Sequence, residues 1–315
     1  MPECHPKGDR RRAGRNAFLA LCLLLCVGLL PCAPALAWNA AGHRLIAALA
    51  WQQMTPSARQ WATDLLRRHP DHDRWLKRQR EQDADYGVFL EASTWADDIR
   101  NDPRFHDPNE PATSRLPGFP DMLRHTNWHF RDSPEENRKR RSPKGEIDLR
   151  LALLARQLQQ DDPRQQVYAL PWVLHLVGDI HQPLHTAGRY DGGGNGMTVE
   201  NPYANSRKTW MSLHAYWDGL PGASWLRGKQ LETPLRRIAA LPKPEQGNVP
   251  AWLLESRRLV QQTGRIYPDG QKGPMLRITP EFHQRAQSLA DHRLTAAGAR
   301  LGRWLNQLSE RERTR

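Results

Sequence analysis

The stretch RQQVYALPWVLHLVGDIHQPLH, residues 164–185, decides the fold class of this 315-residue chain. Apolar residues recur at helical spacing until Pro183 ends the pattern, which predicts a long helix with a strongly apolar side. Two polar residues are unusual in that setting. His175 and Asp179 lie four positions apart and therefore share one face of the helix. His185 follows directly after the proline stop.

Helical periodicity also dominates the sequence on both sides of this stretch. Further helices are expected over residues 38–54, 56–68, 85–100, 146–160, 249–266 and 279–308. Thr-Pro pairs at 55–56 and 279–280 suit helix starts, with threonine as the N-cap and proline in the first turn. Only GMTVEN, residues 196–201, alternates like a strand. The sequence therefore predicts a mainly α, single-domain helical bundle over residues 38–315, with loops near 101–121 and 132–145.

The first 37 residues have the composition of a targeting segment. A basic stretch, the apolar run AFLALCLLLCVGLL and small residues follow in the order of a secretory signal peptide, with an A-x-A site at 35–37. The run is short for a membrane span, although an uncleaved anchor is the alternative. Cleavage removes all four cysteines. We therefore expect a thiol-free chain, secreted or periplasmic, with no membrane attachment after cleavage.

The charge balance points to polyanionic partners without identifying one. The formal net charge is +12, and removal of five basic and two acidic residues with the signal leaves +9. Such a chain suits nucleic acid, anionic lipid or cell-wall polymers, and a generally basic, soluble surface is the alternative. The basic run NRKRR, residues 137–141, allows either phosphate contacts or a solvated loop.

A second helix repeats the spacing of the first. His214 and Asp218, in LHAYWD, are again four positions apart. Zinc binds imidazole nitrogen and carboxylate oxygen, so two such pairs can hold more than one ion. An aspartate on a buried helix is costly unless it is paired or metal-bound. A hydrogen bond along one helix face remains the alternative for either pair alone.

The motifs occur in an order that resembles the zinc-dependent, single-strand-specific nucleases of the mung-bean type, the nuclease S-one/P-one family. That family carries a mature N-terminal Trp, Gly-His, W-A-D-x-x-R, W-H-F, H-x-x-G-D-x-x-Q-P-L-H, D-x-G-G-N and L-H-x-x-W-D. This chain has them in the same order at residues 38, 42–43, 95–100, 128–130, 175–185, 191–195 and 213–218. The resemblance spans residues 38–218 and implies the fold shared by zinc phospholipase C and nuclease P-one.

The resemblance implies three zinc ions per chain. The implied ligand sets are, in turn, Asp97, His129, His175 and Asp179; Trp38 through its α-amino nitrogen and carbonyl oxygen, His43 and a bridging Asp179; and His185, His214 and Asp218. An α-amino ligand exists at Trp38 only after signal cleavage, and the A-x-A site ends directly before that residue.

The resemblance also implies the reaction. Asp97 and Arg100 are the expected catalytic residues, with the guanidinium placed against the phosphate. Phe130 is expected to stack on a base and Asp132 to accept a hydrogen bond from it. The implied substrates are single-stranded DNA and RNA, cleaved to 5′-phosphate products, with 3′-nucleotidase activity. No stable protein partner is implied, and a monomer is expected.

Two other functions are compatible with parts of the sequence. A bacterial zinc phospholipase C resembles the chain in its N-terminal Trp and three-zinc pattern, but it typically has glutamate in place of Asp218 and lacks Arg100. A non-catalytic zinc or polyanion binder is the alternative outside enzymes. Among the remaining histidines, His181 is expected beside the ligands or at the surface, and His125 next to a ligand. Surface positions are expected for His69, His72, His106, His283 and His292.

Overall fold

The computed structural model describes residues 38–132, 144–160, 162–189, 191–204, 209–268 and 275–313. All of them belong to one compact unit. The predicted signal segment and the basic run at 137–141 lie outside the described residues. No helix in the described part of the chain combines the length and apolarity needed to cross a membrane.

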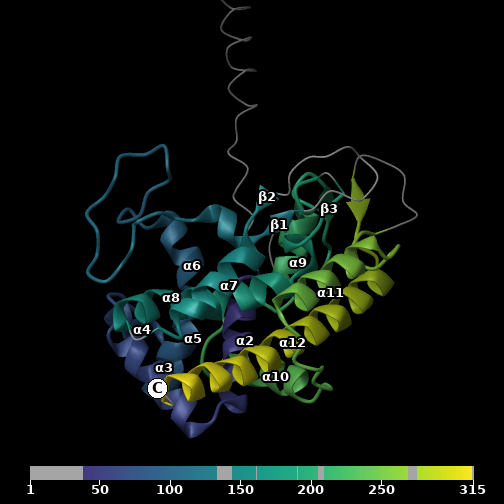
Figure 1. The fold of residues 1–315 in the computed structure, drawn as a ribbon. Coiled ribbons are helices and arrows are strands. Elements are labelled where there is room, and N and C mark those ends of the chain that lie inside the picture. Colours follow the sequence, from purple (N-terminus) through teal and green to yellow (C-terminus); the bar gives the residue numbers. More distant parts are fainter. Residues whose placement is uncertain are drawn as a thin grey trace, which may run out of the picture. The chain divides into compact units, whose positions relative to one another are not determined.

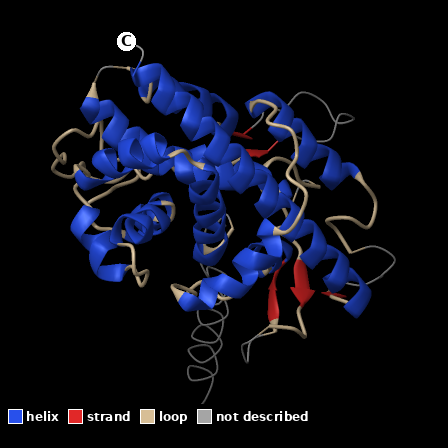
Figure 2. Ribbon diagram, turned by 90° about the horizontal axis from the view of Figure 1, so that it is seen from below, coloured by secondary structure: helices blue, strands red, loops and turns tan. Residues whose placement is uncertain are grey.

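The mainly α class predicted from the sequence is confirmed (Figures 1 and 2). The α-helices are α2 (Ala40–Gln53), α3 (Pro56–Arg67), α4 (His72–Arg78), α5 (Ala84–Ala92), α6 (Trp95–Asp98), α7 (Ile147–Gln157), α8 (Pro163–His181), α9 (Leu213–Gly219), α10 (Lys229–Ala239), α11 (Val249–Gln261) and α12 (Pro280–Arg313). The 3₁₀ turns are η1 (Ile99–Asn101), η2 (Thr126–His129) and η3 (Pro183–His185). The strands are β1 (Arg131–Asp132), β2 (Lys144–Gly145), β3 (Thr198–Glu200), β4 (Trp210–Ser212) and β5 (Leu276–Arg277).

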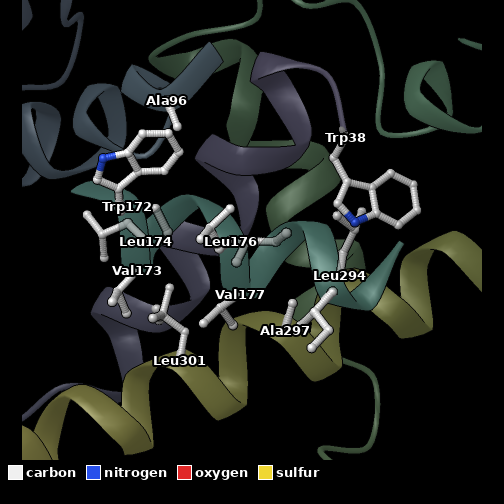
Figure 3. Close-up of a cluster of buried hydrophobic side chains, with 14 of the residues drawn as sticks. Trp38, Ala96, Trp172, Val173, Leu174, Leu176, Val177, Leu294, Ala297 and Leu301 are labelled. Carbon is white, nitrogen blue, oxygen red and sulfur yellow. The ribbon is translucent and has the colours of Figure 1, made fainter. Parts of the chain in front are cut away.

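Helix α8 packs against both α2 and α12 at the centre of the core. In Figure 3, Leu294, Ala297 and Leu301 of α12 face Val173 and Val177 of α8, and these side chains are buried. Their burial removes apolar surface from water, which is the main force that holds the three helices together.

Small residues let α12 approach α2 closely. A Cβ placed on Gly302 of α12 would lie 2.6 Å from the carbonyl oxygen of Ala50, well inside van der Waals contact. A Cβ on Gly298, one turn earlier, would lie 2.7 Å from Cβ of Leu49. Any larger residue at either position would push the helices apart. The C-terminal helix is therefore part of the core that supports the N-terminal one.

The two helix starts predicted at the Thr-Pro pairs are confirmed. The Thr55 hydroxyl accepts the backbone N–H of Ala58 at 3.2 Å, and Pro56 is the first residue of α3. Helix α12 likewise begins at Pro280. The strand predicted in GMTVEN is also present as β3, which pairs with β4 in antiparallel and with β5 in parallel orientation.

One predicted helix is wrong. The segment 85–100 is not continuous but breaks between α5 and α6 at Ser93 and Thr94. The Ser93 hydroxyl donates to the Leu90 carbonyl at 2.7 Å, and the Thr94 hydroxyl donates to the Glu91 carbonyl at 2.9 Å. These local bonds compete with the helical ladder, which is why serine and threonine often end helices. Helices α4 and α10 were not predicted, and α11 ends at Gln261, before the expected residue 266.

The surface position predicted for His69 is also wrong. The side chain is buried, its ring stacks on Trp75 at 4.5 Å, and its Nδ1 accepts the N–H of Asp71 at 3.0 Å. Phe119, from the loop expected near 101–121, packs against the same ring at 5.3 Å. This loop therefore contributes apolar side chains to the core. His292 is exposed, and His72, His106 and His283 are partly buried.

Candidate metal centre

Three groups of histidine and aspartate side chains converge around the C-terminal half of α8. Within each group, one potential ligand atom per residue lies within 4.8 Å of the others. The groups are His43, His175 and Asp179; Asp97, His129 and His175; and His185, His214 and Asp218. The first two share His175, and together they are called the paired group. The last is called the third group.

Several separate elements supply these side chains. Helix α8 contributes His175 and Asp179, one turn apart as the spacing predicts. The other contributors to the paired group are α2 with His43, α6 with Asp97 and η2 with His129. In the third group, η3 contributes His185 and α9 contributes both His214 and Asp218. The centre therefore forms only when the chain is folded.

In the paired group, three imidazoles surround one buried carboxylate. Oδ2 of Asp179 lies 3.0 Å from Nδ1 of His129 and 3.3 Å from Nε2 of His175. Its Oδ1 lies 3.3 Å from Nε2 of His43. Asp97 is slightly more distant, with Oδ1 3.7 Å from Nε2 of His175. Both oxygens of Asp179 therefore face ring nitrogens, as a bridging carboxylate would.

Backbone carbonyls fix the tautomers of three histidines. Nδ1 of His175 donates to the Ser93 carbonyl at 2.9 Å, made available by the break between α5 and α6. Nδ1 of His185 donates to the His129 carbonyl at 2.7 Å. Nδ1 of His214 donates to the Gly193 carbonyl at 2.7 Å. A neutral imidazole has one proton, so each Nε2 carries a lone pair directed into the centre.

This arrangement places acceptors against acceptors. Nε2 of His185 and Nε2 of His214 are 3.0 Å apart, and in these tautomers neither nitrogen can donate to the other. Oδ2 of Asp218 lies 3.4 Å from the same His214 nitrogen. Buried lone pairs at this distance repel each other unless a cation lies among them. The donor set therefore fits a metal ion, and imidazole nitrogen with carboxylate oxygen is typical of zinc.

Electrostatics favours the neutral form of three of these histidines, whereas the Asp179 and Asp97 carboxylates outweigh burial and raise the pKa of His175. Burial lowers the pKa of His43 and His185, and burial together with the Arg100 guanidinium lowers the pKa of His129 to about 3. These rings are therefore neutral at neutral pH and can bind a metal. Burial alone would raise the pKa of Asp179, but His175 and its neighbours outweigh it and hold that pKa well below the usual range. Asp179 is therefore ionised.

Asp218 behaves differently because burial outweighs the Gln182 hydrogen bond and the Arg100 charge, which both lower its pKa. Burial raises its pKa well above the usual range, and the Asp97 and Asp179 carboxylates raise it further. An isolated buried carboxylate of this kind takes up a proton. A cation in the third group would keep Asp218 ionised.

Arg100 lies beside the paired group, as the W-A-D-x-x-R motif predicts. Its Nε lies 3.1 Å from Oδ1 of Asp97, and the side chain is buried. Phe130 follows His129 directly, Asp132 lies two residues further on, and both are partly buried. Burial raises the pKa of Asp132, and the nearby Asp191 carboxylate adds to the effect.

The glycine loop at 191–196 supports the third group. Gly193 has φ of +66°, and a Cβ there would lie 2.3 Å from the Leu184 carbonyl oxygen. Only glycine tolerates both conditions. The loop carries the carbonyl that orients His214. Asn195 donates within the loop, to the Gly192 carbonyl at 2.7 Å.

Trp38 lies next to the centre but is absent from the side-chain groups. Its side chain is buried, close enough to α2 that a Cβ on Gly42 would lie 2.7 Å from Cβ of Trp38. The next residue, Asn39, donates its backbone N–H to the Asp218 carbonyl at 3.1 Å. The start of the described chain is therefore attached to the third group.

The remaining histidines near the centre have other partners. His181 is buried: its Nδ1 donates to the Val177 carbonyl at 2.7 Å, and Arg300 lies 3.0 Å from its Nε2. The structure thus excludes a surface position for it. Nε2 of His125 lies 2.9 Å from Asp121, and its ring stacks on Trp128 at 3.6 Å. Neither histidine faces the metal groups.

A family model described as S1/P1 Nuclease matches residues 38–310. The chain belongs to this family. It is also 38% identical over 88 residues to Endonuclease 4 of Arabidopsis thaliana. That match covers 27% of this chain and 28% of the relative. The S1/P1 Nuclease match includes all the residues of the paired and third groups.

Proposed function

We propose that this chain is an exported phosphodiesterase that holds three zinc ions and hydrolyses single-stranded DNA and RNA. The products would carry 5′-phosphates, and 3′-nucleotidase activity would accompany endonuclease cleavage. The observation that carries this proposal is the set of buried imidazole lone pairs that face one another, and two carboxylates, within a member of the S1/P1 Nuclease family.

The proposed zinc ligands follow the three groups. His43 and Asp179 would hold one ion together with the amino nitrogen and carbonyl oxygen of Trp38. Asp97, His129, His175 and Asp179 would hold a second, and His185, His214 and Asp218 a third. When bound, zinc supplies a Lewis acid and lowers the pKa of a coordinated water.

The chain's own residues would position the phosphate and the base. The Arg100 guanidinium, buried beside Asp97, can donate to the non-bridging phosphate oxygens as negative charge develops on them. Asp97 would orient the attacking water. The Phe130 ring is suited to stacking on one base, and its partial exposure leaves room for this contact. Asp132 would accept a hydrogen bond at the edge of the base.

We expect a preference for single strands, because a base must leave its stack to reach an aromatic ring such as Phe130. Stacking accepts any base, so we expect little sequence preference. A lipid headgroup has no base to stack, which makes phospholipid the less suitable substrate for a site with Phe130 beside a zinc ligand.

Signal cleavage during export would create the last ligand of the proposed zinc site. The family match begins at Trp38, the residue that cleavage at the predicted A-x-A site would expose. The new α-amino group can bind zinc because metal binding drives its deprotonation. The protein would act as a monomer in the periplasm or outside the cell, without a stable protein partner.

The decisive experiment compares the chain starting at Trp38 with the same chain carrying one extra Met before it. Zinc content and hydrolysis of single-stranded DNA are measured for both, with and without a chelator. We expect three zinc ions and chelator-sensitive cleavage for the first form, and loss of zinc and activity for the second. Equal activity in both forms would rule out Trp38 as a ligand. Zinc binding with hydrolysis of phosphatidylcholine but not of DNA would favour the phospholipase alternative.

A further inference from the structure

Gln182 lies between the paired group and the third group. It follows the last residue of α8, its side chain is fully buried, and it is not among the proposed ligands. Its backbone N–H donates to the Asp179 carbonyl at 3.0 Å. Its side-chain Nε2 donates to Oδ1 of Asp218 at 2.9 Å, and its Oε1 accepts the N–H of Leu184 at 2.7 Å.

These partners determine the orientation of the amide. The Leu184 N–H requires an acceptor and the Asp218 carboxylate requires a donor, so the oxygen must face Leu184 and the nitrogen Asp218. A flipped amide would place donor against donor and acceptor against acceptor. Gln182 is therefore fixed at both ends of its side chain.

The bond gives the two Asp218 oxygens different partners. Oδ1 is held by the Gln182 amide, which leaves Oδ2 as the oxygen facing Nε2 of His214, at 3.4 Å. Without this donor the carboxylate could rotate, and a buried oxygen would lose its hydrogen bond. Partners of this kind commonly fix the geometry of a metal ligand.

We propose that Gln182 is a positioning residue that orients the Asp218 carboxylate toward a metal ion in the third group. The inference rests on the proposed function, because it assumes that a cation binds there. It assigns a purpose to a buried glutamine that is not among the proposed ligands. His185 and His214 keep their own carbonyl partners, so loss of the amide would weaken this group without abolishing it.

A purely structural role of Gln182 must be distinguished from the positioning role. Gln182 also caps the turn η3 through Leu184, so any change there can lower stability. The variant Gln182→Asn retains an acceptor for the turn, since asparagine is a good cap, but it is one methylene too short to reach Asp218 in the same way. Gln182→Met keeps the volume and removes both hydrogen bonds.

Gln166 provides a matched control on the same helix. It is also buried, and its amide donates to the Gln160 carbonyl at 2.9 Å, at the opposite end of α8 from the metal groups. Gln166→Met therefore removes a comparable hydrogen bond without touching Asp218. If Gln182 has only a structural role, Gln166→Met and Gln182→Met should differ only in melting temperature.

The test is a zinc competition titration against a chromophoric chelator, with melting temperature measured in parallel, on the chain starting at Trp38. We expect one of three zinc ions to bind about 10- to 100-fold more weakly in Gln182→Asn and Gln182→Met, and no such change in Gln166→Met. Wild-type affinities in both Gln182 variants would overturn the inference alone. A wild-type chain that binds no zinc would overturn the proposed function and this inference together. If Gln182→Met does not fold, Gln182→Asn decides the result.

Discussion

Two buried polar clusters flank helix α2, and they differ in how their hydrogen-bond donors and acceptors are matched. On one side His43 faces the metal groups. The next residue, Arg44, points into a cluster centred on the buried Glu91, whose oxygens lie 2.7 Å from Nε of Arg44, 2.8 Å from Nε of Arg78 and 2.8 Å from Nε of Arg227. In the Glu91 cluster every acceptor meets a donor. In the metal centre acceptors meet acceptors.

This difference separates a structural cluster from a functional one. Burial opposes ionisation of Glu91, but its arginine neighbours outweigh burial and hold its pKa below the usual value. The Glu91 cluster is thus satisfied without any further ion. In the metal centre, ring nitrogens that can only accept face each other and the Asp218 carboxylate, and a cation among them would relieve their repulsion, which is the physical argument for a metal ion. Each prediction below tests one side of this contrast.

The largest effect is expected from Asp179→Asn. The substitution keeps the shape of the side chain but removes the charge that bridges the paired group. We expect loss of zinc and a fall in hydrolysis of about 10⁴-fold, because metal ions contribute several kcal/mol to transition-state stabilisation. The control is Asp291→Asn, which removes a buried aspartate that is bonded to Arg237 at 2.7 Å. Equal zinc content in the two variants would contradict the assignment of the paired group.

Glu91→Gln should lower the stability of the fold without lowering its zinc content. It leaves Arg44 buried without a counter-charge, and loss of one partner from a buried ion pair costs about 3–5 kcal/mol. We expect urea denaturation to show this loss in the free energy of unfolding, while the folded fraction retains its zinc. If the variant loses zinc but keeps its stability, the Glu91 cluster belongs to the metal centre and the contrast fails.

Arg100→Ala should lower kcat while leaving zinc bound. The guanidinium is placed to stabilise charge on the phosphate, and removal of one such donor typically costs about 10²- to 10³-fold in kcat. Arg100→Lys should recover part of the rate, because lysine keeps the charge but not the paired N–H geometry. Zinc content is measured beside steady-state kinetics. Loss of zinc in the alanine variant would mean that Arg100 acts by holding Asp97.

Much of this architecture could be predicted from the sequence, for identifiable reasons. Periodicity and Thr-Pro starts place α3 and α12, because capping and proline geometry are local. The spacing of four places His175 and Asp179 on one face of α8, as the structure shows. The motif order indicated side chains that do lie together in the fold, although their roles as zinc ligands remain proposed.

The rest depends on contacts between distant segments. The carbonyls of Ser93, His129 and Gly193 orient three histidines, and a backbone carbonyl leaves no signal in the residue type. Gln182 stands in a motif that was recognised, yet its bond to Asp218 spans 36 positions. The break between α5 and α6 shows the same limit, since serine and threonine can stay in a helix or end one.

His69 tests the same contrast with the smallest expected effect. It is a buried histidine that lies outside the metal groups. Burial, with smaller contributions from Arg104 and His72, lowers its pKa to about 3. The unfolded chain binds a proton near pH 6.5, so between pH 6.5 and about 3 the unfolded state holds more protons than the folded state. Stability must therefore fall as the pH falls through this window, by about 1 kcal/mol per pH unit from this one group.

His69→Phe removes the titration and fills the same aromatic pocket, at a cost of about 1 kcal/mol at pH 7 from the lost bond to Asp71. Urea denaturation at several pH values should show a shallower slope below pH 6.5 in the variant than in the wild type. Equal slopes would mean that His69 does not contribute to the acid sensitivity of the protein.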